Sequence, residues 1–222
     1  MDNLVISNIR QRPLRSAISV LGVALGVTLV MLFTGLSRGM SDDLQRRSSN
    51  VRAEIIFTRP GGFQGVTTAN LSTKYVDMLK KIDGVGFVVP VIRHFYVSGI
   101  WGVDQVEGVD WDSFAQMSNV RLVQGHGPKA PDEVVIDETK ASRNHPVGSS
   151  LKIFGEKEFK VVGIFSPESG ARAKLTLEAM QGLLEVPGKC SYILVKCRNP
   201  AEQIAVAQRI NDQLPAVIVT TN

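Results

Sequence analysis

The apolar run Ala17-Ile18-Ser19-Val20-Leu21-Gly22-Val23-Ala24-Leu25-Gly26-Val27-Thr28-Leu29-Val30-Met31-Leu32-Phe33 decides the fold of this chain. It lies within a longer stretch, from Ser16 to Ser37, that carries no charged side chain and no histidine. A helix needs about 20 such residues to cross the hydrocarbon core of a bilayer. No other stretch of the 222-residue chain is long and apolar enough. We therefore predict one membrane helix that carries one large domain on a single side of the membrane.

Three arginines set the expected orientation of this helix. Arg10, Arg12 and Arg15 precede the span, together with a single acid, Asp2. Short basic flanks stay on the cytoplasmic side, so we predict a single-pass protein of the cell (inner) membrane with a cytoplasmic N-terminus and an extracytoplasmic C-terminal domain. A cleaved signal peptide is the alternative, but its apolar region is usually only about 7–15 residues long and ends at a small-residue cleavage site.

Two glycines within the span, Gly22 and Gly26, are four residues apart and fall on one helix face. Such a pair lets a second helix approach closely, which would make this face a packing site. The competing interpretation is that glycine is simply common in membrane helices.

Composition narrows the class of protein. The chain has 25 basic and 21 acidic residues and a net charge of +4. Much of the excess flanks the span, so the remaining domain is nearly neutral and nucleic acid is not an expected partner. Cys190 and Cys197 bracket a predicted strand, in which seven residues span about 23 Å. A disulfide requires Cα atoms within about 7 Å, so no bridge is expected between them.

The part after the span predicts a mixed α+β domain. The expected organisation is a basic entry segment (1–15), the membrane helix (16–37), a helical stalk (38–50) and a core domain (51–222) of two interleaved subdomains, one of them inserted at about 106–170. Alternating or β-branched runs between turn residues predict strands. These strands are 53–58, 85–91, 94–99, one around Val106, 133–136, a hairpin of 150–154 with 158–164, then 192–197 and 217–219.

Helices are expected where apolar residues recur every three to four positions after a capping residue. The predicted helices are 72–82 capped by Ser72, 111–117 after Asp110, 138–143 capped by Asp137, 177–184 capped by Thr176, and one that starts at Asn199-Pro200 and ends at Pro215. Asp110 is interpreted either as the cap of the second of these helices or, with Asp112, as a metal-binding pair. The inner face predicted for the last of these consists of Ile204, Ala207, Ile210 and Leu214.

Residue patterns for catalysis are lacking. A phosphate-binding loop requires G-x-x-x-x-G-K-[ST], and the nearest match, from Gly182 to Cys190, has the wrong spacing and a cysteine in place of the hydroxyl. The histidines His94, His126 and His145 are too scattered to predict a metal site, and no G-x-S-x-G elbow marks a nucleophile. We therefore predict no catalytic residue, no metal ligand and no cofactor, and a chain that is not itself an enzyme.

The order of several segments resembles the permease subunit of MacB-type ABC transporters, the superfamily that includes MacB, LolC/LolE and FtsX. The resembling segments are Asn8–Arg15, Leu21–Val27, Arg59–Gly61, Gly108–Asp110, Asp132–Ile136, Val147–Leu151 and Phe159–Ile164. Two departures accompany them. Ser149 stands where the family usually has Asp, and the family continues after this domain with three more spans, whereas this sequence stops at Asn222. A truncated chain, a partial reading frame and a stand-alone anchored protein all remain open on this reading.

The resemblance implies a mechanical role. A separate ABC ATPase would move the spans, and the outer domain would transmit that motion to substrate export or to a periplasmic partner protein. A second permease copy or homologue and the membrane lipid are further implied partners. The arginines Arg10, Arg12 and Arg15 would serve either as topology signals or as contacts to the ATPase. Two rival hypotheses remain: an anchored extracytoplasmic binding or adaptor domain that works without an ATPase, and an anchored hydrolase whose site the sequence does not reveal.

Overall fold

The structure, a computed structural model, describes residues 13–59, 69–98, 102–214 and 218–221. Its first element is the helix α2, Pro13–Val51, which ends where Arg52 adopts a positive φ of 54°. In the described residues, α2 is the one helix long and apolar enough to cross a membrane. The hydroxyls of Thr28 and Thr34 donate to the carbonyls of Ala24 and Val30, each at 2.7 Å. Both hydroxyls therefore have a hydrogen-bond partner within the helix itself, as a lipid environment requires.

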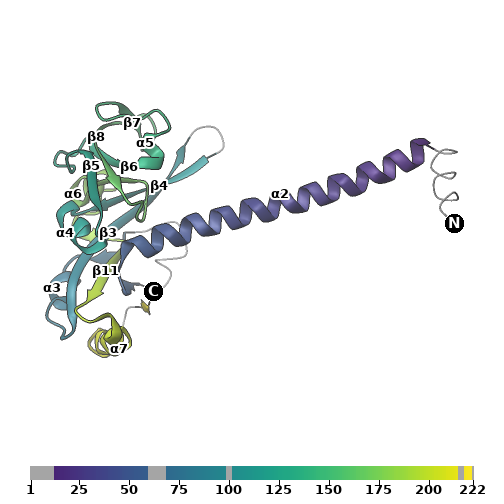
Figure 1. Cartoon of the computed structure of the whole chain (residues 1–222). Coiled ribbons are helices and arrows are strands. Elements are labelled where there is room, and N and C mark those ends of the chain that lie inside the picture. Colours follow the sequence, from purple (N-terminus) through teal and green to yellow (C-terminus); the bar gives the residue numbers. More distant parts are fainter. Residues whose placement is uncertain (1–12, 60–68, 99–101, 215–217, 222) are drawn as a thin grey trace. The chain divides into compact units, whose positions relative to one another are not determined.

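The chain divides into two compact units, Met1–Gln45 and Arg46–Asn222. The last turn of α2 thus belongs to the second unit, which we call the domain (Figure 1). The prediction of a mixed α+β domain behind an apolar helix is confirmed. Ten strands form one sheet in the order β12-β1-β11-β3-β4-β9-β6-β8-β5, with β7 paired to β8. Short β2 and β10 make a separate pair.

The strands of the large sheet have the following bounds: β1 Ile55–Thr58, β3 Val85–Ser98, β4 Gly102–Val109, β5 Arg121–Gly125, β6 Glu133–Asp137, β7 Ser150–Lys152, β8 Glu158–Ser166, β9 Ala173–Thr176, β11 Tyr192–Cys197 and β12 Ile218–Thr221. The small pair is β2 Leu71–Ser72 and β10 Lys189–Cys190. The helices of the domain are α3 Tyr75–Leu79, α4 Trp111–Ser118, α5 Glu138–Ala141, α6 Leu177–Leu183 and α7 Gln203–Gln213, the last preceded by the 3-10 turn η1 Pro200–Glu202.

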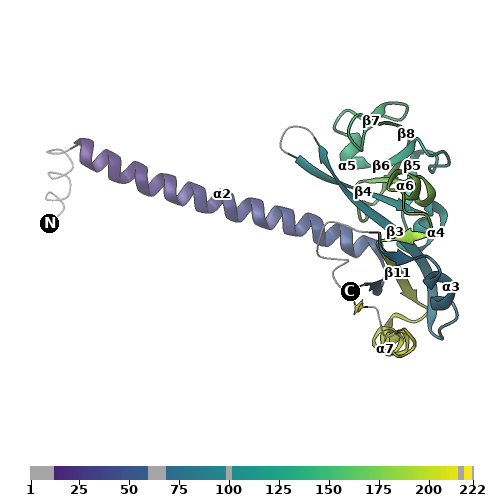
Figure 2. The same ribbon diagram turned by 180° about the vertical axis from the view of Figure 1, so that it is seen from behind.

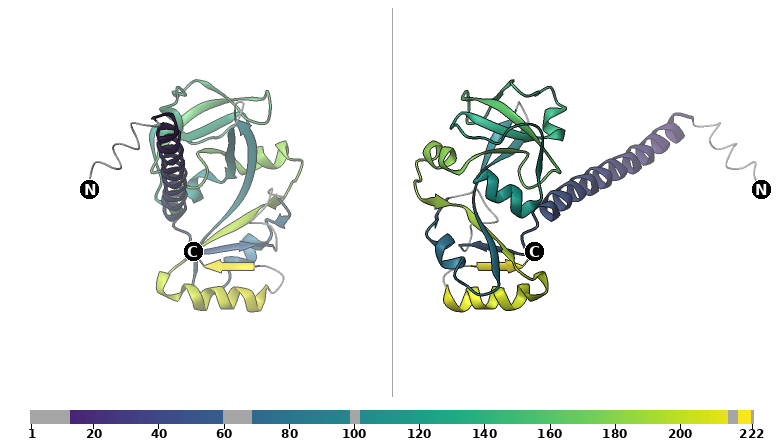
Figure 3. Two further views of the ribbon diagram at one scale, coloured as in Figure 1. Left: turned by 90° about the vertical axis from the view of Figure 1, so that its right-hand side faces the viewer. Right: turned by 60° about the vertical axis from the view of Figure 1, so that its left-hand side comes forward.

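Strand β3 joins the two halves of the sheet. It pairs with β11 from Val85 to Val91 and with β4 from Val91 to Ser98, and Figure 3 shows it curving along the domain. The sequence predicted two strands here, 85–91 and 94–99. That division is wrong: the antiparallel ladder continues through Ile92 and Arg93, which lie opposite Gly108 and Glu107 in β4.

Each face of the sheet buries its own hydrophobic cluster. Side chains alternate between faces along a strand, so Ile193 and Val195 belong to one cluster while Tyr192 and Leu194 belong to the other. Helices α3, α6 and α7 cover the first face, and α4 covers the second. Figure 3 shows α7 beside β12 at one end of the sheet and the β7–β8 hairpin at the other end.

Three of the predicted helix caps are confirmed. Asp110 accepts from Ser113 N at 2.9 Å, Asp137 from Lys140 N at 2.7 Å, and Thr176 from Ala179 N at 3.1 Å. Each side chain satisfies a backbone donor that the first helical turn leaves without an intrahelical partner. The caps thereby fix where α4, α5 and α6 begin.

Two local predictions are wrong. Ser72 does not cap a helix: it lies in β2 opposite Lys189, and α3 begins only at Tyr75. Ile204 was expected on the buried face of α7, yet its side chain is 72% exposed, whereas Val206 is buried. Ile204 lies six residues before the buried Ile210 in α7, which places the two side chains about 120° apart around the helix axis.

Both cysteines are buried and unpaired, Cys190 in β10 and Cys197 at the end of β11. Burial raises the pKa of the Cys190 thiol to about 12. Cys190 is therefore a small apolar side chain of the core, and its thiol stays protonated near neutral pH.

Candidate functional site

A short loop between β8 and β9 contacts the last turn of α2. We call residues 167–172 the junction loop. Arg47 and Gly170 bond reciprocally: Gly170 N donates to the Arg47 carbonyl at 3.2 Å, and Arg47 Nη1 donates to the Gly170 carbonyl at 3.3 Å. Asn50 Nδ2 donates to the Glu168 carbonyl at 2.7 Å. The end of the helix is thus fixed to this loop by backbone as well as side-chain groups.

The same loop contacts a buried carboxylate on its other side. Glu107, in β4, is 1% exposed, and its Oε2 accepts from Ala171 N at 3.1 Å. Gly170 has a φ of +61°, and a Cβ added there would lie 2.6 Å from Glu107 Oε2. A residue other than glycine would therefore be strained in backbone conformation and would also collide with the carboxylate. The loop approaches Glu107 this closely because residue 170 has no side chain.

Glu107 is the centre of a four-residue ion cluster. Its Oε2 also accepts from Lys174 Nζ at 2.7 Å, and its Oε1 accepts from Arg93 Nη2 and from the Tyr192 hydroxyl, both at 2.8 Å. Arg93 Nη2 donates in turn to the Tyr192 hydroxyl at 2.7 Å. The four residues come from β11, β3, β4 and β9, which are consecutive in the sheet. The ion cluster thus connects four neighbouring strands through side chains as well as through the ladder.

The ion cluster lies against aromatic rings. Lys174 Nζ is 4.2 Å from the ring centroid of Phe114 and 5.6 Å from that of Phe165, and the Arg93 guanidinium is 4.9 Å from that of Tyr192. Cations are attracted to ring faces, most strongly where water is excluded. Breaking a buried charge pair by removal of one partner costs about 3–5 kcal/mol, so the members of the cluster hold one another in place.

Burial and neighbouring charges act in opposite directions on the pKa values of the ion cluster. Burial alone would raise the pKa of Glu107, but the charges of Lys174 and Arg93 and their hydrogen bonds outweigh it and hold that pKa well below its usual range. Burial lowers the pKa of Lys174, and Glu107 opposes this effect. Burial raises the pKa of Tyr192 well above its usual value. Glu107 is therefore ionised and Tyr192 protonated near neutral pH.

A second polar chain continues from the junction loop to α5. Arg172 Nη1 contacts Asp137 Oδ2 at 2.9 Å and Glu168 Oε1 at 3.2 Å. Asp137, fully buried, is the cap of α5. Burial raises its pKa, although the bond from Lys140 N and the charge of Arg172 oppose the shift. The junction loop therefore contacts three parts of the domain: the end of α2, the ion cluster and the start of α5.

Comparisons with known proteins identify the family of this chain. The family model described as the MacB-like periplasmic core domain matches residues 16–213. The chain belongs to this family. A curated relative, the macrolide export ATP-binding/permease protein MacB of Syntrophobacter fumaroxidans (strain DSM 10017 / MPOB), is 24% identical over an alignment of 190 residues, and the match covers 73% of this chain and 26% of that protein. The chain thus spans about a quarter of the length of this relative.

Two solved structures share the fold. The periplasmic region of MacB from Actinobacillus actinomycetemcomitans superposes with a TM-score of 0.57 at 16% identity, covering 78% of this chain and 91% of that one. The extracellular domain of the ABC-type transporter YknZ from Gram-positive bacteria gives 0.54 at 14% identity, covering 76% of this chain and 99% of that one. The described domain is therefore a MacB-like periplasmic core domain of an ABC transporter permease, preceded by one candidate membrane helix.

The predicted site residues of this MacB-like chain lie in or before α2. Gly22 and Gly26 are exposed, and a Cβ added at either would meet no atom within 4 Å in the described structure. Arg15 is exposed near the start of α2. Arg10 and Arg12 lie outside the described residues. In the parts of the chain that the structure describes, no three His, Cys, Asp or Glu side chains come together in a way that could hold a metal.

The ion cluster of this MacB-like domain has only a faint signal in the sequence. Glu107 and Lys174 are each the single charge within a short apolar run, Val106-Glu107-Gly108-Val109 and Ala173-Lys174-Leu175. A charged residue is rarely fully buried unless it is paired, so such an isolated charge would indicate a partner. The identity of the partner depends on the parallel pairing of β4 with β9, which no local pattern predicts.

Proposed function

We propose that this chain is part of a MacB-type ABC transporter permease and that its domain transmits a displacement of the membrane helix into the sheet. The observation that carries the proposal is the double contact of the junction loop. Gly170 bonds to Arg47 at the end of α2, and the next residue, Ala171, bonds to Glu107 in the ion cluster. One peptide unit therefore separates the helix contact from the sheet contact.

The path of the displacement follows from these bonds. A shift of the last turn of α2 would move residues 168–170, which are bonded to Arg47 and Asn50. Ala171 would pass the shift to Glu107, and the charge pairs of the ion cluster would pass it to four strands, because breaking a buried pair costs more than moving it. Coupling of this kind needs contiguous packed or hydrogen-bonded groups, which the junction loop and the ion cluster supply.

The pairing of β1 with β12 also supports the proposal. Ile55, four residues after α2, lies directly opposite Thr221 in the β1–β12 ladder. The first and last described strands of the domain are thus hydrogen-bonded neighbours. A displacement applied at this place would act on both ends together.

We infer that a separate ABC ATPase drives the helix from the cytoplasmic side, that a second permease copy or homologue packs against the span through Gly22 and Gly26, and that a periplasmic partner or an exported substrate receives the motion. The arginines Arg10, Arg12 and Arg15 would fix the N-terminus in the cytoplasm. The alternative is an anchored binding or adaptor domain that works without an ATPase.

The experiment uses the full chain in lipid nanodiscs together with a candidate ABC ATPase from the same organism. Spin labels are placed in two separate preparations at Ser48, exposed at the end of α2, and at Val123, exposed in β5. Distances between labels on two copies are measured by pulsed electron paramagnetic resonance with and without ATP. We expect ATP to change both distances in the otherwise unaltered protein.

A matched pair of variants tests the path itself. Gly170→Ala disturbs the contact with Glu107, whereas Gly155→Ala, at a φ of +72°, introduces the same backbone strain where no atom lies within 4 Å. Gly170→Ala should keep the change at Ser48 and lose the change at Val123, and Gly155→Ala should keep both. An unaltered change at Val123 in Gly170→Ala would refute transmission through the junction loop. The absence of any ATP-dependent change, with no association of the ATPase, would favour the adaptor alternative.

Orientation is tested by cysteine labelling in intact cells. A cysteine replacing Glu156, whose side chain is 89% exposed, should react with a membrane-impermeant reagent, and one replacing Asn3 should not. The buried native cysteines give little background. The reverse result would invert the topology. Comparing ATPase recovery by the full chain and by an Arg10/Arg12/Arg15→Gln variant of verified topology then separates an ATPase contact from a pure topology signal.

A further inference from the structure

A groove lies on the side of the domain that carries α4, α6 and β5, which lie together in Figures 1 and 2. Strands β4 and β9 run parallel and end side by side, with Val109 opposite Thr176. Each is followed at once by a helix, α4 after Asp110 and α6 after Thr176. The starts of these two helices form one wall of a recess of about 540 Å³, and residues 125–129 after β5 form the other wall. This volume is within the range of ligand pockets.

The floor of the recess is a fixed aromatic ring. Trp111 packs against Phe165 with ring centroids 5.8 Å apart. On its other side, a Cβ added to Gly127 would lie 2.4 Å from Trp111 Cδ1, so the backbone of the loop touches the indole directly. Leu122 completes this apolar part. The ring is therefore held between the core and the loop while one part of it faces the recess.

A second recess of about 380 Å³ extends the first along α6. The two share Lys129, Thr176 and Glu178, and the second continues to Lys157 and Leu183. Together they make a groove with an uneven distribution of charge. The first recess has three carboxylates, from Asp110, Asp112 and Glu178, against Lys129 and the imidazole of His126. The second recess adds Lys157 at the far end.

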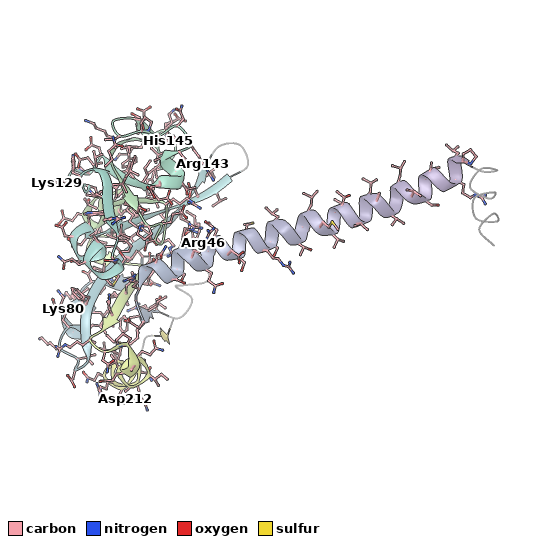
Figure 4. The ribbon with its side chains drawn as sticks, in the orientation of Figure 1. Arg46, Lys80, Lys129, Arg143, His145 and Asp212 are labelled. Atoms are coloured by element: carbon pink, nitrogen blue, oxygen red, sulfur yellow. The ribbon has the colours of Figure 1, made fainter. Side chains whose placement is uncertain are left out.

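The open edge of the sheet borders the groove. Within the described residues, β5 is the last strand of the sheet and pairs on one side only, with β8. Leu122 and Gly125 belong both to β5 and to the lining of the first recess. An exposed sheet edge can accept an extended peptide as a further strand, in which main-chain hydrogen bonds provide affinity and adjacent pockets for side chains provide specificity. Figure 4 shows Lys129 pointing outward beside this edge.

From the edge, the aromatic floor and the charges, we propose that this groove binds an extended, cationic segment of an extracytoplasmic partner protein. The segment adds as a strand to β5. It places a Lys or Arg among Asp110, Asp112 and Glu178, over the face of Trp111, where a cation is attracted both by the carboxylates and by the ring. The methylene stem of that Lys or Arg contacts Leu122. The inference extends the proposed function, because it names the chemistry of a recipient, but binding in the groove does not require the membrane helix to move.

The test uses the full chain in detergent with Trp101→Phe, which leaves Trp111 as the single tryptophan because the sequence contains two. The probes are two synthetic peptides of about ten residues, the length of a long strand, one alternating Lys with Val and the other alternating Glu with Val. The Lys-Val peptide should change Trp111 fluorescence saturably and should protect the amides of residues 121–125 from hydrogen exchange. The Glu-Val peptide should do neither.

Matched variants decide whether the groove or general charge is responsible. Asp112→Asn/Glu178→Gln should weaken binding of the Lys-Val peptide by roughly tenfold, because two charge pairs in water are lost and salt screens each of them. Asp212→Asn/Glu156→Gln removes two exposed carboxylates elsewhere and should leave binding unchanged. Equal weakening in both double variants, equal binding of both peptides, or binding without protection of 121–125 would overturn the proposal. So would peptide-independent self-association that shields Trp111, since the occupant would then be a second copy.

Discussion

Replacing Gly170 by alanine tests the closest contact in the junction loop. Gly170 has a φ of +61°, and the new Cβ would lie 2.6 Å from Glu107 Oε2 and 3.2 Å from Glu107 Cδ. The carboxylate cannot turn away at low cost, because its oxygens hold Lys174 and Arg93. The substitution therefore combines backbone strain with overpacking of a buried ion pair.

The expected magnitude has two parts. A residue with a Cβ in the left-handed region costs about 1–2 kcal/mol, and overpacking a buried site costs about 1–3 kcal/mol more. Gly155→Ala, at a φ of +72° with no atom within 4 Å of the added Cβ, should show only the first part. We expect Gly170→Ala to lower the free energy of unfolding by about 2–5 kcal/mol and to exceed Gly155→Ala by the overpacking term.

The measurement is urea unfolding of the full chain in detergent, followed by tryptophan fluorescence and analysed by linear extrapolation. A double-mutant cycle with Glu107→Ala isolates the contact. In that background the obstructing oxygen is gone, so Gly170→Ala should cost no more than Gly155→Ala. Equal losses for Gly170→Ala and Gly155→Ala in the otherwise unaltered chain would show that the close approach to Glu107 does not constrain the loop, and the reasoning would fail.

Three further predictions follow from the same structure. The folded-state pKa of Glu107 is lowered, so its contribution to stability is present above the unfolded pKa of about 4.3 and is lost as pH falls towards the folded value. Glu107→Gln should therefore lower the urea midpoint at pH 7 and should flatten the fall of that midpoint below pH ~4.5. An unchanged pH profile of the midpoint would contradict this. A soluble chain that begins at Arg46 should be more stable to urea, by about 1–3 kcal/mol, than one that begins at Val51. The longer chain keeps the hydrogen bonds of Arg47 and Asn50 to the junction loop. Equal urea midpoints for the two chains would show that these bonds do not stabilise the domain. Substituting Gly22 and Gly26 by leucine should reduce cross-linking between two copies in membranes while leaving the domain's stability unchanged, and unaltered cross-linking would exclude packing through this face.

Local sequence patterns predicted those parts of the fold that depend on neighbours in the chain. The apolar helix, the β7–β8 hairpin and the caps at Asp110 and Asp137 all follow from residues within a few positions of one another. The strand β9 did not follow, because its four residues lack periodicity and its partners β4 and β6 are far away in sequence. Strand β5 was missed for a related reason: it is exposed along most of its length, and its two apolar residues are adjacent instead of alternating with polar ones.

The ion cluster could not be predicted for the same physical reason. Arg93 and Glu107 are 14 residues apart in a hairpin, but Lys174 and Tyr192 reach the same carboxylate from 67 and 85 residues away. Charges at these distances have no sequence spacing that indicates contact. The contact depends on the order of strands in the sheet, which is a property of the whole domain.

The change of partner along β3 has a consequence for how the two halves of the sheet can vary. Val91 is the one position of β3 that pairs with both β11 and β4. Residues before it depend on the strands of one half, and residues after it depend on those of the other. Insertions, deletions or altered loops in either half therefore need to preserve only this crossing point to keep the whole ladder in register. A fold with such a division can acquire a new outer surface on one half while the other half keeps its geometry.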